Sequence, residues 1–145
     1  MKLRVYREVK ARLPLKNIRF VFDEIVRREA DRDWTGTVNL IITDDVCIRK
    51  LNRQFRKKDR ATDVLSFNID QPVDRDSIFG EIYISDPTVR RQARQYGVTD
   101  RDEYLRLVGH GLLHLFGYDH MKKYEAEEMR AREEFYHRLA ARKKR

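Results

Sequence analysis

The sequence predicts one α+β domain in which a small, mixed, four-stranded sheet packs with about five helices. Three observations support this fold class. The chain has 145 residues, and neither an internal repeat nor a long linker divides it, so we expect residues 1–145 to share one hydrophobic core. The apolar periodicity runs strand, helix, strand, helix, strand, strand and then three helices. A short polar segment joins the third and fourth strands, which favours antiparallel pairing between them.

The first half of the chain is expected to alternate between strands and helices. Residues 3–9 alternate apolar and charged side chains as a strand does, and residues 15–30 carry apolar side chains at helical spacing. Residues 37–43 are rich in β-branched and aliphatic side chains and predict a second strand. Asp44 then caps a helix that runs to Phe55.

The second half is expected to hold two strands and three helices. Residues 62–67 and 79–85 predict strands, with a turn between them. Asp86 followed by proline predicts a helix start, and Gly97 predicts its end. The next two helices are expected from the Thr99 cap to residue 115 and over residues 124–142.

Composition limits the class of protein. The sequence contains no apolar run of membrane-spanning length and no apolar secretory leader at its start, so we expect a cytoplasmic protein without a membrane partner. Its single cysteine, Cys47, fits a reducing compartment. The 32 basic and 24 acidic residues leave a net charge of +8, which favours a polyanionic partner such as nucleic acid. Seven of the basic residues lie between Arg49 and Arg60.

Three histidines predict a metal site. His110 and His114 are one helical turn apart, so both imidazoles project from one face. Gly117 can end the helix in the left-handed conformation and let the chain bring His120 back toward the first two. Three nitrogen ligands and one open position are typical of a catalytic zinc ion, which acidifies water and stabilises an anionic oxygen.

The residues around the histidines narrow the chemistry. Gly111 stands where proteases of the H-E-x-x-H type carry their glutamate base, which argues against peptide hydrolysis. Asp119 is the nearest acid. It could orient a ligand imidazole by accepting a hydrogen bond, act as a general base, or stabilise the turn. Gly109 lies inside the helix at a cost of about 1 kcal/mol relative to alanine, so we expect close backbone packing there.

Two segments resemble a known family. The run HGLLHLFGYDH from His110 to His120 resembles the H-G-x-L-H-L-x-G-Y-D-H signature of the YbeY family of bacterial metal-dependent endoribonucleases. Residues 55–67, FRKKDRATDVLSF, resemble its second marked segment, and the Gly-Glu-Ile at 80–82 is similar to its G-[DE]-I strand. The resemblance follows the whole chain in order and length.

The resemblance implies a function and a set of site residues. It implies that His110, His114 and His120 bind one zinc ion and that Arg56 is the essential arginine. It also implies cleavage of single-stranded RNA, maturation of the 3′ end of small-subunit ribosomal RNA and ribosome quality control. A guanidinium such as that of Arg56 can hold a phosphate by two hydrogen bonds and offset charge in a phosphoryl transition state. The neighbouring basic residues expected to contact RNA are Arg53, Lys57, Lys58 and Arg60.

Two other functions stay open at this point. The chain could be a metallohydrolase of another substrate class. It could also be a non-catalytic zinc-containing ribosome assembly factor, in which Asp63 or Glu81 supplies a fourth ligand and closes the site. The sequence also leaves open whether water or the ribose 2′-hydroxyl attacks the phosphorus.

Overall fold

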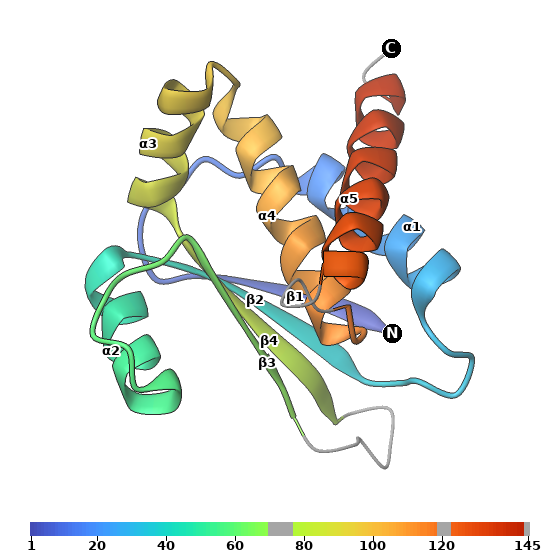
Figure 1. Ribbon diagram of the computed structural model, residues 1–145, viewed down its shortest axis with the longest axis horizontal. Helices are drawn as coiled ribbons and strands as arrows, with labels where there is room; N and C mark the ends of the chain where they lie inside the picture. The colour runs from blue at the N-terminus through green and yellow to red at the C-terminus, as the bar shows by residue number, and fades with distance from the viewer. Residues whose placement is uncertain (70–76, 119–122, 144–145) are drawn as a thin grey trace.

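The computed structural model describes residues 1–69, 77–118 and 123–143 (Figure 1). Its nine elements follow the predicted order and are β1 (Lys2–Arg7), α1 (Leu15–Glu29), β2 (Thr37–Thr43), α2 (Asp45–Arg56), β3 (Val64–Asn68), β4 (Ile78–Ser85), α3 (Asp86–Tyr96), α4 (Asp100–Leu115) and α5 (Lys123–Lys143). The predicted turn at 71–77 lies almost entirely outside the described residues.

The four strands form one mixed sheet in the order β1-β2-β4-β3. β1 pairs parallel with β2, and β2 pairs parallel with β4. β3 pairs antiparallel with β4, with Leu65 opposite Tyr83, as the short connection predicts. The α+β class, the mixed four-stranded sheet and the five helices are therefore confirmed, and β3 is an edge strand.

The helices are divided unequally between the two faces of the sheet. Figure 1 shows α1, α3, α4 and α5 on one side and α2 alone on the other. The core lies between the sheet and the larger group of helices, and its fully buried side chains include Ile18, Ile25, Leu40, Ile82, Ile84 and Leu112. Within the described residues, no helix has both the length and the apolar character needed to cross a membrane.

Helix α4 packs against the sheet through Gly111, and the expectation of close packing at Gly109 is wrong. A Cβ atom added at Gly111 would lie 2.9 Å from Ile82 Cγ2 and 3.0 Å from Ser66 Oγ. A Cβ atom at Gly109 would meet only Ile25 Cδ1 at 3.8 Å, an ordinary contact. Gly111 therefore brings the helix backbone onto β3 and β4, and a side chain at this position would be directed into the sheet.

Several predicted boundaries shift by a residue or two, and β3 runs over Val64–Asn68 instead of residues 62–67. β1 ends at Arg7 instead of residue 9. The side chain of Ser85, not of Asp86, accepts a hydrogen bond from the backbone N–H of Thr88 and caps α3. The helix end at Gly97 and the Thr99 cap of α4 are confirmed.

Candidate metal centre

Helix α4 presents His110 and His114 side by side. The hydroxyl of Thr99 caps the first turn by accepting a hydrogen bond from the backbone N–H of Asp102 at 3.1 Å. Both imidazoles are half-buried, and their ring centres lie 4.7 Å apart at 76°. In a tetrahedral zinc site with zinc–nitrogen distances of about 2.0–2.1 Å, the centres of two ligand rings lie about 5 Å apart. The observed approach of the rings fits two ligands of one metal ion.

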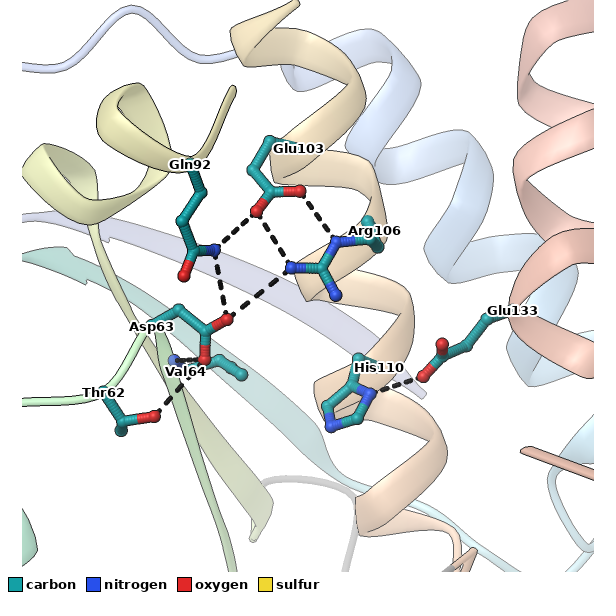
Figure 2. Close-up of polar contacts among 8 residues, drawn as sticks. All are labelled: Thr62, Asp63, Val64, Gln92, Glu103, Arg106, His110 and Glu133. Carbon is teal, nitrogen blue, oxygen red and sulfur yellow. Dashed lines mark hydrogen bonds and ion pairs between the residues drawn. The ribbon is translucent and has the colours of Figure 1, made fainter. Parts of the chain in front are cut away.

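A carboxylate from α5 holds the first of these rings. Nδ1 of His110 contacts Oε1 of Glu133 (Figure 2), and 24% and 19% of the two side chains are exposed. A carboxylate that accepts a hydrogen bond from Nδ1–H selects the tautomer whose Nε2 carries the free lone pair. Glu133 therefore prepares Nε2 of His110 to bind a metal ion.

Helix α4 ends at Leu115, and Gly117 takes a left-handed conformation directly after it, as predicted. Gly117 has a φ of 102°, and its N–H donates to the carbonyl of His114 at 3.0 Å. The N–H of Tyr118 donates to the carbonyl of Leu113 at 3.0 Å. These two bonds form a Schellman motif, which ends a helix and redirects the chain. His120 and Asp119 follow at once and lie outside the described residues.

The start of this turn is fixed to the rest of the protein by Glu29. Its carboxylate, with 7% of the side chain exposed, accepts hydrogen bonds of 2.7 Å from the hydroxyls of Tyr118 and Tyr136. Burial and the charge of Glu29 raise the pKa of Tyr118 to about 12, so this phenol keeps its proton at any physiological pH. Tyr118 thus anchors the segment that leads to His120.

The described residues supply two of the three predicted ligands. Among residues 1–69, 77–118 and 123–143, no group of three or more histidine, cysteine, aspartate or glutamate side chains gathers to hold a metal ion. The two acids considered as a closing ligand are bound elsewhere. The carboxylate of Asp63 bonds the N–H of Val64 and the amide of Gln92. Glu81 bonds Asn39 and Tyr83 on the face of the sheet that points away from α4.

A buried polar network ties the segment before β3 to α4. Glu103, with 1% of its side chain exposed, accepts hydrogen bonds of 2.7 and 2.9 Å from Arg106 and of 2.6 Å from Gln92. Gln92 and Arg106 also reach the carboxylate of Asp63, at 3.2 and 3.6 Å (Figure 2). The hydrogen bonds to Glu103, against the opposing effect of burial, raise the pKa of Arg106. Since Arg106 lies one turn before His110, the network fixes the start of β3 relative to the histidine helix.

Arg56 lies at the outer edge of the sheet, beside β3. It is the last residue of α2, and its Nη2 donates to the carbonyl of Ser66 at 3.3 Å. The hydroxyl of Ser66 donates to the carbonyl of Gly111 at 3.1 Å, and Gly111 follows His110 directly. Two hydrogen bonds thus connect the predicted phosphate-binding arginine to the backbone of the histidine helix. Only one of the five N–H groups of Arg56 is used in the described residues, so the others can bind a phosphate.

The remaining basic residues surround the C-terminal end of α2. Arg49 pairs with Asp59 through bonds of 2.8 and 3.1 Å, and these hydrogen bonds lower the pKa of Asp59. Lys57 ends the helix in the left-handed conformation at φ 56°. In the segment from Arg49 to Arg60, which the structure describes in full, the exposed basic side chains without an ion pair to a described residue are Lys50, Arg53, Arg56, Lys57, Lys58 and Arg60. The one acid of this segment is therefore used by Arg49, and six cations face solvent.

A cavity of about 660 Å³ opens between α4 and α5. Its wall includes Gly109, Arg106, Glu133 and His137, but neither His110 nor His114. The cavity thus reaches the carboxylate that holds His110 without forming the histidine site.

Sequence reasoning missed Glu133, although the sequence contains a signal for it. The buried residues of α5 are Met129, Tyr136 and Ala140, and Glu133 falls on the same helical stripe. An acidic residue within an apolar stripe indicates a buried polar contact. Its partner could be found only once the docking of α5 against α4 was known.

The fold and the histidine pair define a small α+β protein with a candidate metal centre beside a basic surface. A family model described as Endoribonuclease YbeY matches residues 5–140. The chain belongs to the YbeY endoribonuclease family, which confirms the resemblance found in the sequence.

Individual relatives agree with this assignment. A protein named Endoribonuclease YbeY from Thermotoga maritima is 38% identical over 133 residues, which cover 92% of this chain and 81% of that protein. Proteins of the same name from Aquifex aeolicus and Persephonella marina are 47% and 48% identical over 91 and 85 residues. These matches cover 63% and 57% of this chain, and 61% and 56% of the two relatives.

A solved structure shares the fold. The solution structure of a protein from Thermotoga maritima superposes with a TM-score of 0.66 at 36% sequence identity. The superposition covers 95% of this chain and 88% of that one. The arrangement of sheet and helices described above is therefore similar to that of a known protein over nearly the whole chain.

Proposed function

We propose that this chain is a metal-dependent endoribonuclease that cuts single-stranded RNA, with His110, His114 and His120 as ligands of one zinc ion. The observation that carries the proposal is the juxtaposition on α4 and β3. Two histidines of α4, one with its ring held by Glu133, are linked through Gly111 and Ser66 to the edge strand β3, whose backbone also accepts a hydrogen bond from Arg56 of α2. The names of the relatives point to the same activity.

Each described residue has a defined task in this proposal. Glu133 orients the ring of His110 so that its Nε2 can face the metal ion, and the imidazole of His114 lies beside it. When bound, zinc supplies Lewis-acid stabilisation of phosphoryl oxygens and makes water a better nucleophile near neutral pH. Arg56 binds the scissile phosphate and offsets the charge that develops on its oxygens.

The substrate class follows from the same surroundings. Gly111 packs against Ile82 and Ser66, so a glutamate base of the H-E-x-x-H type has no room at this position of α4. A phosphodiester suits a site in which cations face the reacting group. Arg53, Lys57, Lys58 and Arg60 neutralise neighbouring phosphates, so binding should weaken as salt rises.

The biological substrate that we propose is ribosomal RNA. The resemblance to the family supports maturation of the 3′ end of small-subunit RNA and a part in ribosome quality control. The net charge of +8 suits a partner that is both RNA and a ribosomal particle.

The test combines metal analysis with RNA cleavage. His114→Ala should lose both bound zinc and cleavage of an unstructured RNA. Arg56→Ala should keep zinc and lose cleavage by about 100-fold or more, as expected for removal of a group that stabilises transition-state charge. Arg53→Ala, three residues earlier on the same helix, is the matched control and should cut at close to the normal rate at saturating RNA. Normal cleavage by Arg56→Ala would refute the role of this arginine.

A further inference from the structure

An exposed aromatic cluster lies on the face of the sheet that points away from α4. Phe55, at the end of α2, is 60% exposed. Its ring meets that of Phe67 edge-on, with 5.5 Å between the centres. Phe67 in turn meets Tyr83 edge-on at 6.0 Å. Three rings from α2, β3 and β4 thus form a row that ends in solvent at Phe55.

Packing of the core does not account for this exposed end. Leu65, the preceding residue of β3 on the same face, is only 2% exposed and fills the space beneath α2. Two residues further along the strand, Phe67 is half-buried and Phe55 covers it only in part. Single exposed apolar residues are common on proteins, so the surroundings of Phe55 must decide whether it binds a ligand.

Arg56 joins the aromatic row to the metal centre. Its guanidinium carbon lies 5.8 Å from the centre of the Phe67 ring, and its Nη2 bonds the carbonyl of Ser66 at 3.3 Å. Ser66 points to α4 and bonds Gly111, whereas Phe67 points to the opposite face. Because β3 is an edge strand, Arg56 lies at the border between the two faces. An RNA strand that passes from the histidine pair across this border would therefore reach Phe55 and Phe67.

The charges around the aromatic cluster favour an anionic ligand such as a nucleic acid strand. Arg53, Lys57 and Lys58 lie within three residues of Phe55 and are exposed. Glu81 lies opposite Phe67 on the neighbouring strand, and its carboxylate accepts hydrogen bonds from Asn39 at 3.2 Å and Tyr83 at 3.3 Å. Aromatic rings flanked by cations are typical of surfaces on which the bases of single-stranded nucleic acid stack.

We propose that Phe55, backed by Phe67 and Arg56, is a stacking platform for unpaired nucleobases that flank the scissile phosphate of the RNA. The inference rests on the proposed function and names a binding subsite of the same substrate. Bases inside a duplex already stack on one another and offer no free face, so the platform also provides a physical basis for single-strand preference.

Binding measurements test the platform separately from cleavage. The affinity for a labelled, unstructured RNA is measured by fluorescence anisotropy over a series of salt concentrations, in the full chain carrying His114→Ala to prevent cleavage. Phe55→Ala should weaken binding by about 5- to 150-fold, since that is the range for loss of one stacked base. The dependence of affinity on salt should not change, because no cation is lost. Arg53→Ala should instead reduce the salt slope by about 0.7.

Two further variants control for indirect effects. Phe55→Trp should bind at least as tightly as the parent, and its emission should be quenched by RNA when Trp34→Phe removes the native tryptophan. Phe135→Ala is the matched control, because Phe135 is an exposed phenylalanine on another helix, α5, and has an arginine nearby, with Arg28 5.1 Å from its ring centre. It should leave RNA affinity unchanged.

The outcomes separate the platform from the proposed function. Affinity of Phe55→Ala within twofold of the parent, or a loss accompanied by a changed salt slope, overturns the platform. Equal binding of single-stranded and duplex RNA also overturns it. If RNA binds through Phe55 but the metal-loaded protein with native His114 never cuts it, the proposed function fails and the platform stands.

Discussion

Removal of the Glu133 carboxylate should weaken metal binding without unfolding the protein. Glu133 Oε1 contacts His110 Nδ1, and both side chains are about four-fifths buried. Loss of a carboxylate that orients a ligand histidine typically lowers metal affinity by about 10- to 100-fold, which corresponds to about 1.4 to 2.7 kcal/mol. Because about a fifth of each side chain is exposed to water, we expect Glu133→Ala to fall near the lower end, at about tenfold.

The assay is competition for zinc with a chromophoric chelator at fixed pH. Glu133→Gln keeps an oxygen acceptor for Nδ1–H and should lose less affinity than Glu133→Ala. Glu134→Ala is the matched control, because Glu134 is the next residue of α5, is exposed and forms an ion pair with Arg138 at 3.6 Å. Zinc affinity of Glu133→Ala within twofold of wild type, or an equal loss in Glu134→Ala, would refute the assigned role of Glu133.

Three predictions concern stability and are measured by urea unfolding. Gly111→Ala should destabilise the protein by about 1–2 kcal/mol, because the new Cβ would lie 2.9 and 3.0 Å from its neighbours, which costs more than the gain in helix propensity. Gly109→Ala should stabilise the protein by about 0.5–1 kcal/mol. A stabilising Gly111→Ala together with a destabilising Gly109→Ala would contradict the packing of α4. Arg106→Ala should cost about 2–3 kcal/mol because it leaves the carboxylate of Glu103 buried without a cation, and a loss below about 0.5 kcal/mol would contradict this. Burial alone would raise the pKa of Asp45, but hydrogen bonds from two hydroxyls and an arginine lower it; Asp45→Asn should therefore be less stable than wild type above about pH 5, and the difference should shrink as pH falls through the native pKa. A difference that does not vary with pH would exclude this contribution.

Local signals in the sequence were sufficient for the elements and for the histidine helix. The Thr99 cap, the apolar spacing of α4 and the stop at Gly117 all act within a few residues of the chain, and the structure confirms each of them. The antiparallel pairing of β3 with β4 was predictable because one short connection joins them. The parallel order of β1, β2 and β4 was not, since it depends on contacts between distant segments.

The rotation of α4 about its own axis determines that Gly111, and not Gly109, lies in close contact with the sheet. Gly111 shares the buried stripe of Val108, Leu112 and Leu115, so the spacing alone could have favoured it over Gly109. Glu133 is a different case, because its contact with His110 joins residues 23 positions apart and depends on how α5 docks. The candidate ligands His110, His114 and His120 could be proposed from the sequence and stay a prediction, whereas the contact of Glu133 with His110 required the tertiary structure.

Zinc titration of the metal-free protein, followed by cleavage of an unstructured RNA, tests the central proposal most directly. The rate of cleavage should rise in proportion to added zinc and stop rising at one equivalent per chain, and His114→Ala should stay inactive throughout. Cleavage at the full rate without added metal, or equal cleavage by His114→Ala, would contradict a metal-dependent nuclease built on the histidines of α4.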